Sequence, residues 1–170
     1  MPQSLPAFAD FRPWVEQQRE ACGSVRIADM PRLVDLLADS TGSADVALRF
    51  GHDPGRRPMI SGEITARLRL LCQRCLQPFD WSTTINLRVG IVTDEAAADN
   101  LPEELDPLLV ANERVRLVEL VEDELILGLP VVARHEDDSA CRPAPSRTGG
   151  ADRKESPFSV LQTLRQRDGT

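Results

Sequence analysis

The residues of this sequence whose spacing most suggests chemistry are its four cysteines, Cys22, Cys72, Cys75 and Cys141. Cys72 and Cys75 form a CxxC pair, a spacing that lets two thiolates reach one ion from a tight turn and supplies half of a tetrahedral zinc site. The best-placed further ligands are His135 and Cys141, whereas Cys22 and His52 are isolated. Zinc, or another soft metal, is therefore the candidate cofactor.

Two other interpretations of the cysteine pair remain open. A redox pair needs its first cysteine at a helix N-terminus, but here Pro78 and a strand-like pattern follow the motif. Alternatively, the two cysteines are small apolar residues of a hairpin turn. No phosphate-binding loop, GxSxG or HExxH motif is present, and only two histidines are available as general bases. The sequence therefore predicts that the protein is not an enzyme.

Charge is unevenly distributed along the chain. The net charge of −7 disfavours non-specific binding to nucleic acid, because phosphate contacts need cations. Residues 56–88 nevertheless carry six arginines against Glu63 and Asp80, while residues 91–125 carry eleven acids against two arginines. This pattern indicates either a protein that binds RNA on one face or two solvated surfaces. The candidate RNA-binding residues are Arg67, Arg69, Arg74 and Arg88.

Two alternating segments flank the cysteine pair. Apolar and polar residues alternate from Ile60 to Leu70 and again from Thr84 to Val89, which is typical of half-buried strands. We predict an antiparallel hairpin with the cysteines at or near its turn. Arg67, Arg69 and Arg88 are then expected on its outer face.

The remaining segments predict short strands over 24–28 and 44–50 and helices over 30–38, 115–130 and 156–166. In the middle helix Glu124 falls inside the apolar arc, whereas Glu119, Glu122 and Asp123 lie opposite it. Glu124 is expected to pair with an arginine at the edge of the core, or else to be a buried acid with a raised pKa. Residues 93–113 are expected to be an acidic connection without regular structure.

The expected fold class is α+β: an antiparallel sheet, whose central hairpin brackets the CxxC, covered by two or three helices. Residues 1–133 are expected to form a single domain with a short N-terminal arm over residues 1–20. Residues 134–155 are expected to be a polar mobile segment, followed by a short terminal helix within residues 156–170. No apolar run approaches the ~20 residues of a membrane span, and the N-terminus lacks signal-peptide features, so a cytoplasmic location is expected.

Three segments in this order carry a family resemblance: CQRCLQPF at 72–79, LVELVEDELILGLPVVARHEDDSAC at 117–141, and SPFSVLQTLRQ at 156–166. Together they resemble the YceD family of large ribosomal RNA subunit accumulation proteins. The resemblance implies a bacterial cytoplasmic protein needed for normal levels of large-subunit (23S) rRNA. By position, the family's motif residues here are Cys72, Cys75, Glu122, Asp123, Glu124, Pro130, His135 and Cys141.

The resemblance favours a non-enzymatic ribosome-biogenesis factor that acts on large-subunit rRNA or on a basic ribosomal protein. An acidic surface suits a ribosomal protein, because such proteins are strongly basic. The alternative is a metal-dependent or redox enzyme acting on RNA. The sequence does not indicate an oligomeric state.

Overall fold

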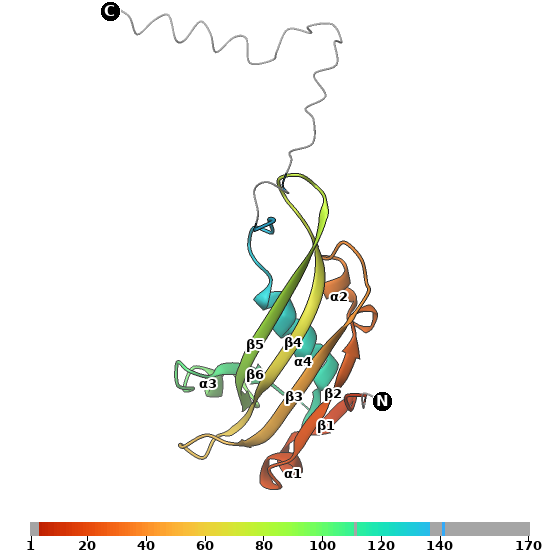
Figure 1. Cartoon of the computed structure of the whole chain (residues 1–170). Helices are drawn as coiled ribbons and strands as arrows, with labels where there is room; N and C mark the ends of the chain where they lie inside the picture. Colours follow the sequence, from red (N-terminus) through yellow and green to blue (C-terminus); the bar gives the residue numbers. More distant parts are fainter. Residues whose placement is uncertain (1–3, 111, 137–140, 142–170) are drawn as a thin grey trace, which may run out of the picture.

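The fold is built on one five-stranded sheet, shown in Figure 1. The computed structural model describes residues 4–110, 112–136 and 141. Neighbouring strands are antiparallel except β5 and β6, which are parallel. This arrangement confirms the predicted α+β class. In sheet order the strands are β2 (Glu20–Arg26), β3 (Ser43–His52), β4 (Pro58–Leu71), β5 (Pro78–Val92) and β6 (Asp106–Leu109).

The predicted hairpin around the cysteines is formed by β4 and β5, which pair from Met59↔Gly90 to Leu71↔Pro78. Ile64 and Leu68 are buried on its inner face, while Arg67 is exposed on the outer face, as the alternation predicted. The pairing of β3 with β4 ends at Ala44↔Ala66. Beyond that point the hairpin projects from the sheet, and its turn forms a tip at one end of the molecule (Figure 1).

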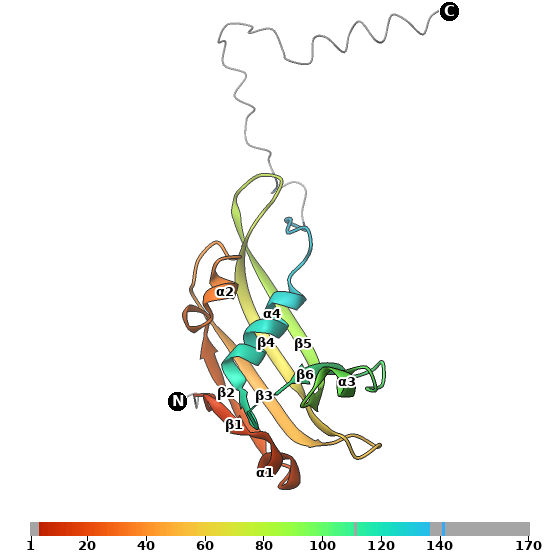
Figure 2. The ribbon, with the colours of Figure 1, turned by 180° about the vertical axis from the view of Figure 1, so that it is seen from behind.

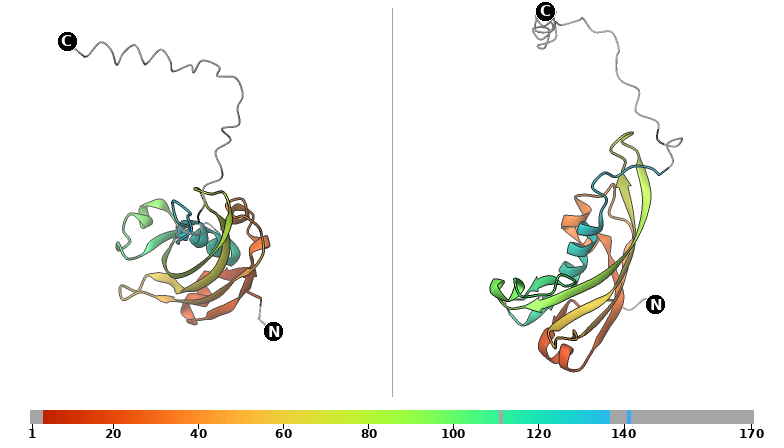
Figure 3. Two further views of the ribbon diagram at one scale, coloured as in Figure 1. Left: turned by 45° about the horizontal axis from the view of Figure 1, so that its top comes forward. Right: turned by 90° about the vertical axis from the view of Figure 1, so that its left-hand side faces the viewer.

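Helix α4 (Leu117–Gly128) lies in the concave face of the curved sheet, as Figures 2 and 3 show. Its buried side chains include Leu117, Leu120, Val121 and Leu125. Burial of each such side chain contributes roughly 1.5–3 kcal/mol, so the apolar arc is sufficient reason for the helix to dock. Helix α4 corresponds to the helix predicted over 115–130 but begins two residues later, because Val115 belongs to the strand β7 (Arg114–Arg116).

The N-terminal residues, which were expected to form a short arm, pack against the rest of the fold. They form β1 (Phe8–Asp10), which pairs with β7, and α1 (Phe11–Glu16). Leu5, Phe11 and Val15 are buried in the same core as the sheet. Each of these short elements buries only one or two side chains, too few to produce a period in the sequence.

Two further segments differ from the predictions. In place of a helix over 30–38 the chain forms only the short α2 (Pro31–Val34), which follows the 3-10 turn η1 (Ile27–Asp29). Ala38 N–H then donates to the Arg69 carbonyl and joins the chain to the sheet. The expected acidic connection over 93–113 contains α3 (Glu95–Ala98) and β6.

The predicted helix over 156–166 and nearly all of the predicted 134–155 segment lie outside the described residues. Within the described part, no helix is long and apolar enough to cross a bilayer.

Candidate metal centre at the hairpin tip

The CxxC pair occupies the turn between β4 and β5. Cys72 N–H donates to the Gln77 carbonyl at 3.0 Å, and Leu76 N–H donates to the Cys72 carbonyl at 2.8 Å. Leu76 has a φ of 59°, a left-handed conformation that a leucine adopts only where the surrounding structure imposes it. The closed turn directs both sulfurs inward, and Cys72 and Cys75 are buried.

The other two predicted ligands arrive from the segment that follows α4. This segment leads to the tip, where Gln73 N–H donates to the Ala133 carbonyl at 2.9 Å. The His135 ring packs on Phe79 with ring centroids 4.9 Å apart. Cys141 is buried among the other two cysteines. The structure therefore brings together residues that are up to 69 positions apart in the sequence.

The four side chains lie close enough together to hold one metal ion. The ligand atoms of Cys72, Cys75, His135 and Cys141 all lie within 4.8 Å of one another. Cys72 Sγ lies 3.6 Å from Cys141 Sγ, and Cys75 Sγ lies 3.5 Å from His135 Nδ1. A tetrahedron with Zn–S of ~2.3 Å and Zn–N of ~2.0 Å has edges of about 3.5–3.8 Å. Three sulfurs and one imidazole nitrogen are a donor set that suits zinc.

The electrostatics of the cluster also favour a cation. Burial alone would raise the pKa of the Cys72 thiol. Its sulfur, however, accepts hydrogen bonds from the backbone N–H groups of Cys75, His135 and Arg74, and these bonds outweigh burial and lower the pKa of Cys72 to about 5. Burial, followed by hydrogen bonding to the neighbouring thiols, raises the pKa of Cys141 to about 11. One thiolate is thus already favoured, and a bound divalent ion would stabilise the others.

The geometry also bears on the other two interpretations of the pair. The CxxC lies in a turn between two strands and not at a helix N-terminus, the position that thioredoxin-like chemistry requires. Cysteines that served only as small apolar residues would have no reason to converge on an imidazole. A metal site is the interpretation that uses all four side chains.

Three of the four predicted arginines, Arg67, Arg69 and Arg88, share the outer face of the hairpin but do not gather into one patch. Arg67 pairs with Asp80 at 2.9 Å, and Arg69 pairs with Asp39 at 3.4 Å. Arg88 lies opposite Ser61, six residues before Arg67 on β4, which corresponds to about 20 Å along the strand. Arg74 is exposed at the tip beside the cysteines.

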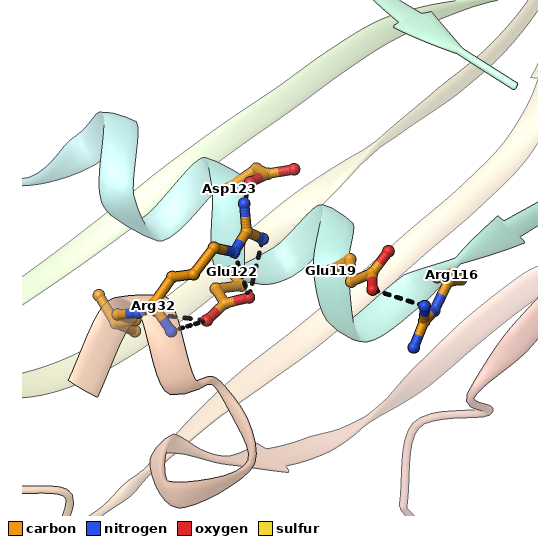
Figure 4. A network of polar contacts seen from close by, with 6 residues as sticks. Arg32, Arg116, Glu119, Glu122 and Asp123 are labelled. Carbon is orange, nitrogen blue, oxygen red and sulfur yellow. Dashed lines mark hydrogen bonds and ion pairs between the residues drawn. The ribbon is translucent and has the colours of Figure 1, made fainter. Parts of the chain in front are cut away.

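A second polar cluster joins α4 to α2, and Figure 4 shows it from close by. Glu122 Oε1 accepts hydrogen bonds from the backbone N–H groups of Arg32 (2.7 Å) and Leu33 (3.1 Å). Its Oε2 accepts from the Arg32 guanidinium at 2.7 Å, and Asp123 accepts from the same group at 2.6 Å. The carboxylate of Glu122 thus satisfies backbone donors at the start of α2, which has no side-chain cap of its own.

The structure corrects the expected roles of the motif acids. Glu122 was placed on the exposed side of its helix but is only 3% exposed, because α2 covers that side. Its partner Arg32, 90 residues away, carried no signal in the sequence. Glu124 is half-buried; burial and then the charges of Asp106 and Asp123 raise its pKa. In the described part of the chain no arginine pairs with Glu124, contrary to the favoured expectation.

A small α+β protein with a projecting, thiol-rich hairpin tip is the class that this fold and site define. The family model described as "Large ribosomal RNA subunit accumulation protein YceD" matches residues 60–165, more than half of the chain, and includes all four candidate ligands. The chain therefore belongs to the YceD family.

A curated relative supports this assignment over nearly the whole chain. The Large ribosomal RNA subunit accumulation protein YceD of Haemophilus influenzae is 29% identical over 170 residues, which cover 96% of this chain and 97% of the relative. No solved structure matches the chain.

Proposed function

We propose that this protein is a non-enzymatic, cytoplasmic ribosome-biogenesis factor required for the accumulation of large-subunit (23S) rRNA, and that it acts by binding rRNA or a basic ribosomal protein. The observation that carries the proposal is the family match over residues 60–165, since the matching family is named for this role. The relative from Haemophilus influenzae bears the same name.

The hairpin tip supports binding rather than catalysis. Catalytic zinc sites keep one coordination position open for water or substrate, whereas structural sites fill all four with protein ligands. Here four protein ligands are available, and three of them are buried. Zinc bound by Cys72, Cys75, His135 and Cys141 would fasten the segment after Pro130 to the hairpin and hold the tip in one shape.

The surface charges favour a basic protein partner over rRNA. The net charge of −7 repels a polyphosphate, and two of the candidate arginines are already neutralised by Asp80 and Asp39. Four of the acids of residues 91–125 are likewise paired with arginines: Glu113, Glu119, Glu122 and Asp123. Others, such as Glu103, Glu104 and Asp106, are exposed and have no ion pair among the described residues, and these would attract a cationic protein and speed its association. Within this proposal, rRNA binding through Arg67, Arg69, Arg74 and Arg88 is the second route.

We predict that deletion of the gene lowers large-subunit rRNA more than small-subunit rRNA, and that the wild-type gene restores the ratio. The measurement is quantification of 23S and 16S rRNA in the deletion strain. Equal levels of the two rRNAs in a clean deletion would contradict the proposed function. The alternative is a metal-dependent or redox enzyme acting on RNA. An RNA cleavage assay with zinc-loaded and zinc-stripped protein tests it, because such an enzyme would give metal-dependent cleavage products.

A second prediction concerns the route through rRNA. If the outer face of the hairpin contacts phosphates, changing Arg67, Arg69 and Arg88 together to glutamate weakens rRNA binding and lowers the slope of log K against log salt by about 2 to 3. Filter binding of rRNA fragments over a range of salt concentrations measures this slope. A slope that is unchanged in the variant would identify these arginines as a solvated sheet face.

A further inference from the structure

Most of one edge of β5 has no strand beside it. On one side β5 pairs with β4 along nearly its whole length, but on the other side β6 covers only Val89–Val92. From Phe79 to Arg88, no backbone hydrogen bond joins this edge to another segment in the described part of the chain. Such an edge presents alternate unpaired N–H and C=O groups to any extended chain that can reach it.

A groove runs along the tip half of this edge. It has a volume of about 500 Å³ and lies between Phe79, Trp81 and Ser82 of β5 and Pro130, Val132 and Arg134 of the segment after α4. Figure 2 shows this segment beside the upper part of β5. Val132 is 49% exposed, and charged side chains, Asp80 and Glu136 among them, also line the groove. The groove thus offers some apolar side chains next to unpaired backbone, the two features that a β-strand partner uses.

Acidic side chains gather where the open edge ends. Asp106, the first residue of β6, pairs with Val89, and Glu103 and Glu104 are exposed just before it. Glu124 of α4 is close enough to Asp106 that the two charges repel, which contributes to its raised pKa. None of these four acids has an ion pair within the described residues, and the open stretch of β5 carries one cation, Arg88. Asp106 and Glu124, which lie near one another and have no ion-pair partner among the described residues, would attract a positively charged partner.

We propose that the β5 edge from Phe79 to Arg88 binds an extended, basic segment of a partner protein as an added strand. Backbone hydrogen bonds to β5 would align the segment, apolar side chains would enter the groove at Val132, and cationic side chains would lie against Glu124 and Asp106. The inference rests on the proposed function and specifies it, because extended basic segments are what a ribosomal-protein partner would have to supply. The same four acids would repel an RNA strand at this edge.

The test uses the full chain and peptides of roughly ten residues, the length of the open edge. The first peptide alternates lysine and valine. The second has the same sequence with every other backbone nitrogen methylated, and it is made in two versions so that each of the two alternating sets of nitrogens is blocked in turn. The third replaces each lysine with glutamate. We expect the first peptide to bind by calorimetry and to protect amides of Phe79–Arg88 from hydrogen exchange. Methylation should weaken its binding at least about tenfold, and the acidic peptide should not bind.

Charge variants test the second part of the proposal. We expect the double variant Asp106→Asn with Glu124→Gln to bind the lysine peptide roughly tenfold more weakly. Glu63→Gln is the matched control. Glu63 is exposed on the outer face of β4 and has no ion pair with any residue that the structure describes, so its removal should leave the affinity unchanged.

Two outcomes would overturn the inference. Equal binding of the methylated and unmethylated peptides would show that only general attraction to acids is at work. The second outcome concerns the free chain. If the amides of Phe79–Arg88 are already protected from hydrogen exchange there, and the substitution Leu161→Asp removes this protection, the chain's own C-terminal segment occupies the edge. Both results concern the edge alone and leave the role in rRNA accumulation intact, since that role is tested by the rRNA ratio.

Discussion

Replacement of Glu122 by alanine is expected to lower the free energy of unfolding by about 3 kcal/mol. The carboxylate is almost fully buried and accepts hydrogen bonds from two backbone N–H groups and from the Arg32 guanidinium. Its removal leaves the N–H of Leu33 buried without an acceptor and removes the buried polar contact between α2 and α4. Chemical denaturation of the purified variant measures the change.

Asp123→Ala is the matched control for this prediction. Asp123 binds the same guanidinium through one ion pair but is exposed, and exposed pairs contribute less than about 1 kcal/mol. Equal losses in the two variants would mean that the Arg32 charge, and not the buried contact of Glu122 with α2, determines the effect. A loss below about 1 kcal/mol for Glu122→Ala would contradict the structural role of this residue.

The second large effect concerns the metal. Untagged protein is expected to contain one zinc ion per chain by native mass spectrometry, and Cys75→Ser is expected to abolish tight binding, because three ligands remain of the four in the cluster. A chelator should have the same effect on the wild-type chain. Loss of the ion should increase hydrogen exchange at the amides of Gln73 and Leu76, whose bonds hold the turn and its link to Ala133.

Cys22→Ser provides the control for metal content. Cys22 is an exposed thiol on β2, away from the cluster, so this variant should retain its zinc. Protein that is folded, metal-free and unaffected by added zinc would contradict the metal site. Zinc retained by Cys75→Ser with unchanged affinity would show that the ion binds elsewhere.

The sequence was most informative where period and spacing are local. The alternation from Ile60 to Leu70 predicted β4 and its outward arginines, and the 3.6-residue period predicted α4, because burial of one face imposes these repeats directly. The CxxC spacing predicted a turn with two ligands. The order of the motifs, rather than any single motif, indicated the family.

The sequence was least informative where the answer depends on contacts between distant segments. Helical periodicity places Glu122 on the polar side of α4, and only the packing of α2 against that side makes it a buried residue. The four-residue helices and the three-residue strands β1 and β7 are too short to show a period. The open edge of β5 follows from how far β6 extends beside it, which no local pattern encodes.

The most direct test of the account is the ratio of 23S to 16S rRNA in a deletion strain that expresses wild-type protein, Cys22→Ser or Cys75→Ser at equal levels. If the metal-closed tip is required for the function, wild-type protein and Cys22→Ser restore the ratio, whereas Cys75→Ser leaves it near that of the deletion strain. Full restoration by Cys75→Ser protein that lacks zinc would contradict the claim that the Cys72, Cys75, His135 and Cys141 centre supports large-subunit rRNA accumulation.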